Sequence, residues 1–187
     1  HKRPEVYGLD TAILMSPKVW EASGHTASFS DSLIDCKNCH YRTRADHLIE
    51  DKYPDTKVEG KSLEELETII KDKHILCPKC GQFDWTSPRL FNQLFETQVG
   101  IITGEKNTAY LRGETAQGMF VDFKQVIDSI HPRLPFGLAQ AGKVFRNEIT
   151  MGKFTFRVLE FDLAEFEYFV EEKDWGQWFE FWKEEVT

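Results

Sequence analysis

The sequence lacks the features of a membrane or secreted protein. No stretch approaches the roughly 18 consecutive apolar residues that a membrane span requires, and no signal-peptide pattern opens the chain. Basic residues are in the minority, with 23 Lys and Arg against 31 Asp and Glu and a net charge of −8. This balance argues against a protein whose whole surface binds nucleic acid, but it leaves room for a local basic site. We expect a cytoplasmic protein.

Several common catalytic patterns are also missing. Neither GxGxxG nor GxxxxGK[ST] occurs, so the two commonest phosphate-binding loops are absent. No Ser/His/Asp or Cys/His arrangement stands out as a nucleophilic centre, and there is no internal repeat or low-complexity segment. The remainder is an ordinary globular composition, 41% apolar and 29% charged over 187 residues, which suits one domain core and a small insertion.

The cysteines form two CxxC pairs, Cys36 with Cys39 and Cys77 with Cys80. Two such pairs can supply four thiolates to one tetrahedral zinc ion, although two disulfides or unrelated buried thiols are also compatible with the spacing. Four cysteine ligands leave no open position, so a zinc ion here would be structural. The nearby His40 and His74 are substitute ligands or simply exposed histidines. The long spacing between the pairs indicates an inserted segment, residues 31–84.

The hydrophobic pattern predicts an α+β fold. Residues 1–30 read as turns and short extended pieces, and the capping box at Ser62 predicts a helix over 62–72. Apolar residues at helical spacing predict further helices over 115–130 and from 175 to 186. Strands are expected over 136–149 and 154–170, paired antiparallel, with a bulge or a change of face near 158 and 159.

Charged residues of this hairpin are candidates for chemistry. Arg146 and Glu148 are two apart on a predicted strand, so their side chains share a face. A guanidinium suits a phosphate or carboxylate, and a carboxylate accepts from an amino group. Arg157 adds a second cation on the returning strand, where Glu160 and Asp162 are candidates to hold magnesium or an ammonium group. The alternative is an ordinary ladder of cross-strand ion pairs.

Five segments carry a family resemblance. Phe145-Arg-Asn-Glu148 followed by Phe156-Arg-Val-Leu-Glu-Phe161 resembles motif 2 of class II aminoacyl-tRNA synthetases. The other four are similar to segments of the dimeric glycyl-tRNA synthetases: Tyr7-Gly-Leu-Asp10, Val19-Trp-Glu-Ala-Ser-Gly-His25, Arg44-Ala-Asp-His47 and Leu111-Arg-Gly-Glu-Thr-Ala-Gln-Gly118. They occur in the family's order, and the cysteine insertion lies where bacterial and archaeal relatives carry one.

The resemblance implies a fold and an activity. The fold is a class II synthetase-like antiparallel sheet flanked by helices, with a small four-cysteine insertion. The activity is ATP-dependent formation of glycyl-adenylate, with Mg²⁺, and transfer of the glycyl group to the acceptor end of tRNA(Gly). The family is homodimeric through a motif that would precede residue 1.

The same resemblance implies roles for individual residues. Arg146 binds the α-phosphate, Glu148 reads the adenine end, and both are the expected catalytic residues. Glu114 holds the glycine ammonium, although a carboxylate at a helix N-terminus is also explained by the helix dipole; Arg44 belongs to the amino-acid site. The expected ATP-binding residues are Arg146, Asn147, Glu148, Phe156, Arg157, Val158, Leu159, Glu160 and the stacking Phe161. The expected glycine-binding segment is Phe161, Asp162, Leu163, Ala164 and Glu165.

The chain departs from the family pattern in places. Gly113 stands where relatives have proline, Leu159 where they have arginine, and Leu163 where they have glutamine. Nothing resembles motif 3 or an anticodon-binding domain. We therefore expect a partial catalytic domain, residues 1–30 and 85–187, carrying the insertion 31–84. The alternatives are a non-catalytic synthetase-like accessory module and a zinc-stabilised RNA-binding module using Lys37, Arg42, Arg44 and Lys79.

Overall fold

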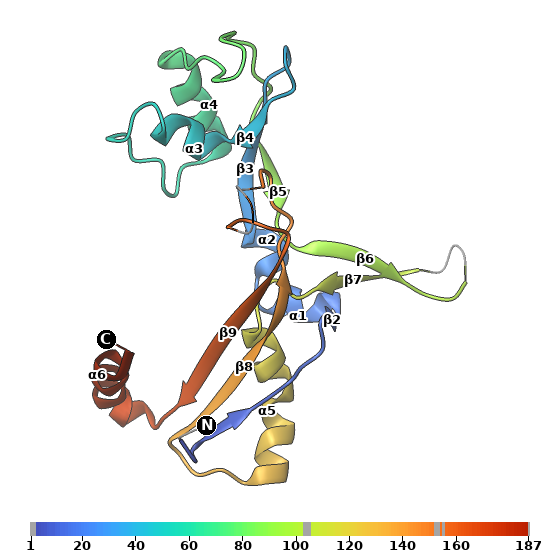
Figure 1. Cartoon of the computed structure of the whole chain (residues 1–187), viewed down its shortest axis with the longest axis vertical. Coiled ribbons are helices and arrows are strands. Elements are labelled where there is room, and N and C mark those ends of the chain that lie inside the picture. Colours follow the sequence, from blue (N-terminus) through green and yellow to red (C-terminus); the bar gives the residue numbers. More distant parts are fainter. Residues whose placement is uncertain (1–2, 103–105, 152–153, 155, 187) are drawn as a thin grey trace. The chain divides into compact units, whose positions relative to one another are not determined.

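The computed structural model describes residues 3–102, 106–151, 154 and 156–186. The chain forms two compact units, whose elements are labelled in Figure 1. Unit 1 comprises residues 1–23, 95–145 and 160–187, and unit 2 comprises residues 24–94 and 146–159. The segment 31–84 that the cysteine pairs delimit therefore lies wholly within unit 2.

The central sheet of unit 1 has the order β1-β8-β9, formed by Val6–Gly8, Phe136–Phe145 and Glu160–Phe169. Strands β8 and β9 pair antiparallel over their whole length, which confirms the predicted hairpin. Strand β1 pairs parallel with β8. The expected antiparallel sheet is therefore wrong at this edge, because a strand that reaches the sheet through a long connection is not forced into the antiparallel direction of a hairpin.

The two long strands are shorter than predicted. Strand β8 ends at Phe145 and β9 begins at Glu160, with one further backbone bond from Arg146 N to Leu159 O (3.0 Å). Val158 and Leu159 lie where the chain passes from unit 2 back to unit 1, so no bulge is needed to explain the change in apolar pattern. The apolar pattern was misleading at the start of the second strand because Phe154 and Phe156, which it counts as strand residues, are exposed outside β9.

Helix α5 (Ala116–Ile130) covers one face of the β1-β8-β9 sheet, as its apolar spacing predicts. Met119 and Val126 of the helix form a buried core with Phe136 and Leu138 of β8. Phe169 of β9 packs against this core, so odd-numbered β9 residues face the helix. This packing fixes the start of α5 against the middle of β9.

The other elements of unit 1 surround this core. Helix α6 (Trp175–Val186), preceded by the 3-10 turn Glu172–Asp174, confirms the last predicted helix and packs Trp178 and Trp182 against Tyr168. A second sheet of order β2-β7-β6 is antiparallel, and its strands are Leu14–Met15, Asn107–Leu111 and Phe95–Val99.

The first thirty residues contain two short helices that were predicted as turns and extended chain. Helix α1 (Pro17–Ala22) starts at the N-cap Ser16, whose hydroxyl accepts from Lys18 N (3.4 Å). Proline at the first helical position has a preset φ and no N–H to satisfy. Helix α2 (His25–Ser28) belongs to unit 2. Both helices are too short to show the apolar spacing on which the prediction relied.

Unit 2 has its own sheet and core. Strand β3 (Ser30–Asp35) lies between β4 (Arg42–Arg44) and β5 (Arg89–Asn92), antiparallel to both. Helix α3 spans Ala45–Glu50 and helix α4 spans Leu63–Asp72, and α4 has both hydrogen bonds of the predicted capping box. The buried core consists of Ile34, Ala45, Leu48, Ile49, Val58, Leu66, Ile70 and Ile75. No described helix of either unit is long and apolar enough to cross a membrane.

Candidate functional site

The four cysteines converge in unit 2. Their Sγ atoms all lie within 4.8 Å of one another, and the thiols are free. The Sγ atoms of Cys36 and Cys80 are 3.6 Å apart, as are those of Cys39 and Cys77. A tetrahedral ion with Zn–S bonds of about 2.3 Å separates neighbouring sulfurs by about 3.8 Å. The cluster therefore fits a zinc ion, and the two-disulfide alternative does not describe this structure.

The two CxxC turns share one backbone geometry. The residue after each pair donates its N–H to the carbonyl of the first cysteine, His40 to Cys36 (2.9 Å) and Gly81 to Cys77 (2.8 Å). Both residues have positive φ, 57° and 73° respectively. His40 thus has a place in the turn, and neither it nor His74 joins the sulfur cluster found among the described residues.

The thiols differ in acidity. A hydrogen bond with the Asn38 side chain lowers the pKa of Cys80 to about 6, whereas burial raises the pKa of Cys39 to about 12. Close thiolates repel one another, and a bound cation offsets this repulsion. The cluster thus has the chemistry of a metal site that holds protons when no metal is bound.

An acidic site lies at the start of α5 in unit 1. Glu165 Oε2 accepts hydrogen bonds from Thr115 N (2.5 Å), Thr115 Oγ1 (2.6 Å) and Ala116 N (3.2 Å), so a β9 side chain caps the helix. Glu114, the residue before Thr115, accepts from Gln117 Nε2 (2.6 Å). The structure thus gathers Glu114 and Glu165, which were both predicted to bind glycine.

Glu167 adds a third carboxylate to this site. It follows Glu165 by two residues on β9 and shares its face. Burial raises the pKa of Glu167, and the charges of Glu165 and Glu114 raise it further. A carboxylate whose ionisation is disfavoured by two neighbouring carboxylates belongs to a site that a cation stabilises. We name Glu114, Glu165 and Glu167 the acidic site.

Arg112 braces the loop that leads to the acidic site. Arg112 is 2% exposed, and its guanidinium donates from Nε to Lys143 O (2.8 Å) and from Nη1 to Thr11 O (2.9 Å). With its amide oriented to satisfy both neighbours, Gln140 also accepts from Arg112 Nη1 (2.5 Å) and donates to Thr11 Oγ1 (2.8 Å). These bonds fix the backbone immediately before Glu114.

Most of the expected nucleotide-binding residues, those from Arg146 to Leu159, lie in unit 2, whereas Glu160 and Phe161 belong to unit 1. The Arg146 guanidinium lies 5.4 Å from the centre of the Phe29 ring, a cation–π contact that orients it. Glu148 Oε2 is 3.3 Å from Arg157 Nε, so these residues form the ion pair that the alternative interpretation predicts. Because the two residues follow the end of β8, the predicted common strand face of Arg146 and Glu148 is not formed.

Arg44 lies beside these residues in unit 2. It pairs with Asp31 (2.8 Å) and Asp46 (2.5 Å), and the hydrogen bond with Asp46 raises the pKa of Arg44. A cavity of about 230 Å³ brings together Thr43, Arg44, His47, Asp51, Glu148, Ile149, Thr150, Met151 and Arg157. The structure therefore gathers Arg44, Glu148 and Arg157 around one polar cavity.

Other predicted residues have different surroundings. The Lys143 ammonium pairs with Asp162 (3.0 Å) and Glu160 (3.7 Å), as the cross-strand alternative predicts. Phe161 and Leu163 are half-buried on the α5 side of β9, whereas Ala164 is exposed. Of the remaining nucleotide-binding candidates, Asn147, Val158 and Leu159 are half-buried and Phe156 is exposed.

Three of the four basic residues named for RNA binding, Lys37, Arg42 and Arg44, form ion pairs, whereas Lys79 is exposed. Arg42 and Arg89 both bind Asp35; burial opposes its ionisation, but the two guanidinium groups lower the pKa of Asp35 overall. Lys37 pairs with Asp84 (3.6 Å). Cations that are paired with carboxylates attract phosphates weakly, so these three residues give the RNA-binding alternative no support.

Comparison with known proteins identifies relatives along almost the whole chain. This chain is 49% identical over 185 residues to the glycine–tRNA ligase of Alkaliphilus oremlandii. It is also 49% identical over 185 residues to the glycine–tRNA ligase of Geobacillus thermodenitrificans. The glycine–tRNA ligase of Ureaplasma urealyticum is 53% identical over 173 residues. The chain is a homologue of part of the glycine–tRNA ligases. The first two alignments cover 97% of this chain and 40% of each ligase, and the third covers 92% and 37%. No family model matches the chain.

Three residues in or around the acidic site, Glu167, Arg112 and Gln117, were not predicted from the sequence. Glu167 could have been found, because residues two apart on a strand share a face. Arg112 and Gln117 stand in the segment that resembles the ligases, but nothing in the spacing shows that one is buried beneath the loop or that the other bonds Glu114. The helix-capping role of Glu165 depends on contact between residues 50 positions apart.

Proposed function

We propose that this chain contains glycine- and ATP-binding residues of a glycine–tRNA ligase. Near-50% identity to these ligases over 97% of the chain carries the proposal. The reaction would join glycine to ATP as glycyl-adenylate, releasing pyrophosphate, before the glycyl group passes to the acceptor end of tRNA(Gly). The family resemblance remains the basis for these roles.

The acidic site supports binding of the glycine ammonium. Glu114 would bind the ammonium group, while Glu165 holds the helix start and Glu167 adds negative charge. Glycine has no side chain to recognise, so selectivity requires a tight site that excludes larger amino acids. The carboxylates in unit 1 supply the charge that such a site needs.

Arg146 and Glu148 of unit 2 support the proposed nucleotide binding. Attack of a carboxylate on the α-phosphate requires positioning and stabilisation of negative charge rather than a protein nucleophile. Arg146, oriented by Phe29, would stabilise that charge, and Glu148 would accept from the adenine amino group. ATP would bring Mg²⁺, which neutralises phosphate charge.

We also propose that the four cysteines hold one structural zinc ion. The four sulfurs would complete its coordination and leave no position for a substrate. Metal analysis should give one zinc per chain, and replacing Cys77 and Cys80 by serine should abolish stoichiometric zinc. An unaltered zinc content in that variant would contradict the assignment.

The enzymatic proposal is tested by glycine-dependent exchange of labelled pyrophosphate into ATP. We expect exchange with the unmodified chain and at least a tenfold loss in Arg146→Ala and in Glu114→Ala. The matched controls are Arg133→Ala and Glu184→Ala, which remove the same charges at exposed positions. Absence of glycine-dependent exchange, or equal rates in the site and control variants, would contradict the proposed function.

A further inference from the structure

Gln117 is a buried polar residue that hydrogen-bonds the Glu114 side chain. It lies on the first turn of α5, is 9% exposed, and donates from Nε2 to Glu114 Oε1 at 2.6 Å. Its amide oxygen is buried and has no hydrogen-bond partner among the described residues. A side chain with only a packing role would be better accommodated here as an apolar residue, because burial of an unsatisfied carbonyl is unfavourable.

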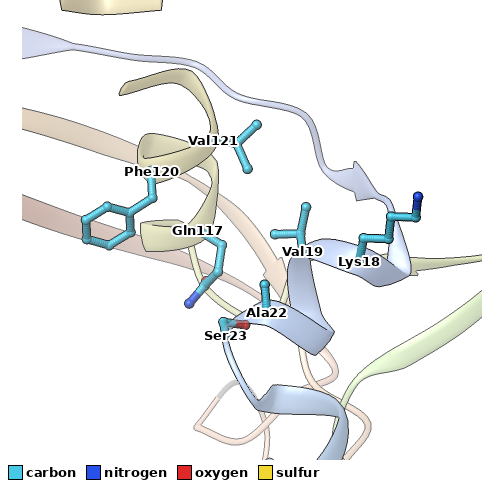
Figure 2. Close-up of a pocket in the computed structure, with 7 residues that line it drawn as sticks. All are labelled: Lys18, Val19, Ala22, Ser23, Gln117, Phe120 and Val121. Carbon is cyan, nitrogen blue, oxygen red and sulfur yellow. The ribbon is translucent and has the colours of Figure 1, made fainter. Parts of the chain in front are cut away.

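Gln117 lines a cavity whose walls are mainly apolar, with Lys18 and Ser23 as its other polar residues. Figure 2 shows Gln117 beside Val19 and Ala22 of α1 and on the same helix as Phe120 and Val121, lining this cavity of about 510 Å³. The apolar side chains of this lining hold Gln117 in place, and its amide N–H donates to Glu114. The Glu114 carboxylate is therefore the group that this amide orients.

We propose that Gln117 is a positioning residue for Glu114. This inference rests on the proposed function, in which Glu114 binds the ammonium group of glycine. The amide holds one carboxylate oxygen of Glu114, so the carboxylate does not have to reorganise on binding the ammonium. A fixed carboxylate is valuable for glycine because the ammonium is one of very few groups that the protein can recognise.

The first test compares glycine binding by calorimetry with the unmodified chain and with Gln117→Met, which keeps the shape and removes the amide. We expect glycine affinity to fall about tenfold, in line with the loss of a hydrogen bond to a charged group. The matched control is Gln125→Met, the same change at an exposed position of the same helix, and it should bind glycine normally.

A second variant separates positioning from a purely structural role. In Gln117→Glu, a protonated carboxyl can donate to Glu114 as the amide does, whereas the ionised form repels it. Glycine affinity relative to the unmodified chain should therefore be retained at mildly acidic pH and fall as the proton shared by the two carboxyl groups is lost. The corresponding ratio for Gln117→Met should not change with pH.

The outcomes separate the two proposals. If the unmodified chain binds no glycine, the proposed function fails and this inference fails with it. If the unmodified chain binds glycine and Gln117→Met binds it equally well, only the positioning role is overturned. A loss in Gln117→Glu that is the same at every pH would also overturn it, because it would indicate a packing defect.

Discussion

Single side chains show how closely the parts of unit 1 are fitted around the acidic site. Glycine at 118 is one such case: a Cβ added there would lie 2.0 Å from Thr11 Oγ1, and Thr11 in turn bonds Arg112 through its carbonyl. Gly118 therefore permits the close approach of α5 to the segment before β2. The helix tolerates a poor helix former because packing requires it.

We expect Gly118→Ala to destabilise the protein by about 1–3 kcal/mol, because the cost of overpacking exceeds the gain in helix propensity. The control is Gly176→Ala, also in a helix, where an added Cβ meets nothing within 4 Å. That variant should gain about 0.5–1 kcal/mol. Denaturant unfolding measures both, and equal effects of the two changes would contradict the packing argument.

Glu167 makes stability depend on pH. Because its pKa is raised on folding, chiefly by burial, the folded state holds its proton to higher pH than the unfolded state. The stabilising contribution of Glu167 to the free energy of unfolding is fully present below its unfolded pKa of about 4.3. This contribution is lost as the pH rises through the pKa of Glu167 in the folded state. The uncharged variant Glu167→Gln should therefore have a higher Tm than the unmodified chain at pH 7 and a similar Tm at pH 4.

The control for this comparison is Glu184→Gln, which removes the same charge from an exposed position on α6. Its Tm difference from the unmodified chain should be the same at both pH values. A Tm difference for Glu167→Gln that is also independent of pH would show that Glu167 ionises no differently in the folded and unfolded states.

At the scale of elements, the two cysteine turns offer a natural comparison. They have the same hydrogen bond and the same positive φ, but one uses glycine and the other histidine. Gly81→Ala should lower the free energy of unfolding by about 1 kcal/mol, because a Cβ strains this positive-φ conformation. His40→Gly relieves a similar backbone strain but makes the unfolded chain more flexible. Its free energy of unfolding should therefore be within about 0.5 kcal/mol of that of the unmodified chain.

Trp85 provides the measurement, because it is the single tryptophan of unit 2 and its indole N–H donates to Ile75 O (2.8 Å) within that unit's core. Thermal unfolding of unit 2, followed by the Trp85 indole signal in NMR spectra, should shift down in Gly81→Ala and hardly change in His40→Gly. Equal destabilisation in both would mean that the turns are not equivalent.

The elements also show what the sequence could predict. Helices α4 and α5 were recognisable because a capping box and apolar spacing are local signals. The cysteine cluster followed from spacing alone. The parallel pairing of β1, the ends of β8 and β9, and the helix cap by Glu165 were not predictable, since each depends on residues distant in sequence. The site residues were named largely from family resemblance, which cannot show that Glu148 pairs with Arg157.

At the scale of the whole molecule, two separate cores predict two separable stabilities. The buried core of unit 2 contains Ile34 and Leu66, and that of unit 1 contains Met119 and Leu138, with no residue in common. If zinc holds the cysteine turns, removing it with a chelator should destabilise unit 2 first. The Trp85 signal should then move to its unfolded position while those of the other four tryptophans remain.

The same loss should follow from replacing Cys77 and Cys80 by serine, without any chelator. A variant with Ser87→Ala, at an exposed hydroxyl of the same unit, serves as a control for the serine exchange and should keep the Trp85 signal. Simultaneous movement of all five indole signals would contradict the prediction and show that the chain unfolds as one cooperative body.

The way the chain alternates between the units has a consequence for synthesis on the ribosome. Residues 24–94 emerge as one stretch that includes the core and all four cysteines of unit 2, so they can fold early. The β1-β8-β9 sheet of unit 1 must wait for β9, which brings Glu165 and Glu167 long after residues 6–8 have left the exit tunnel. The carboxylates of the acidic site are therefore among the last groups to reach their places, and a nascent chain stalled before residue 160 would have cysteine turns able to take metal but only an incomplete acidic site.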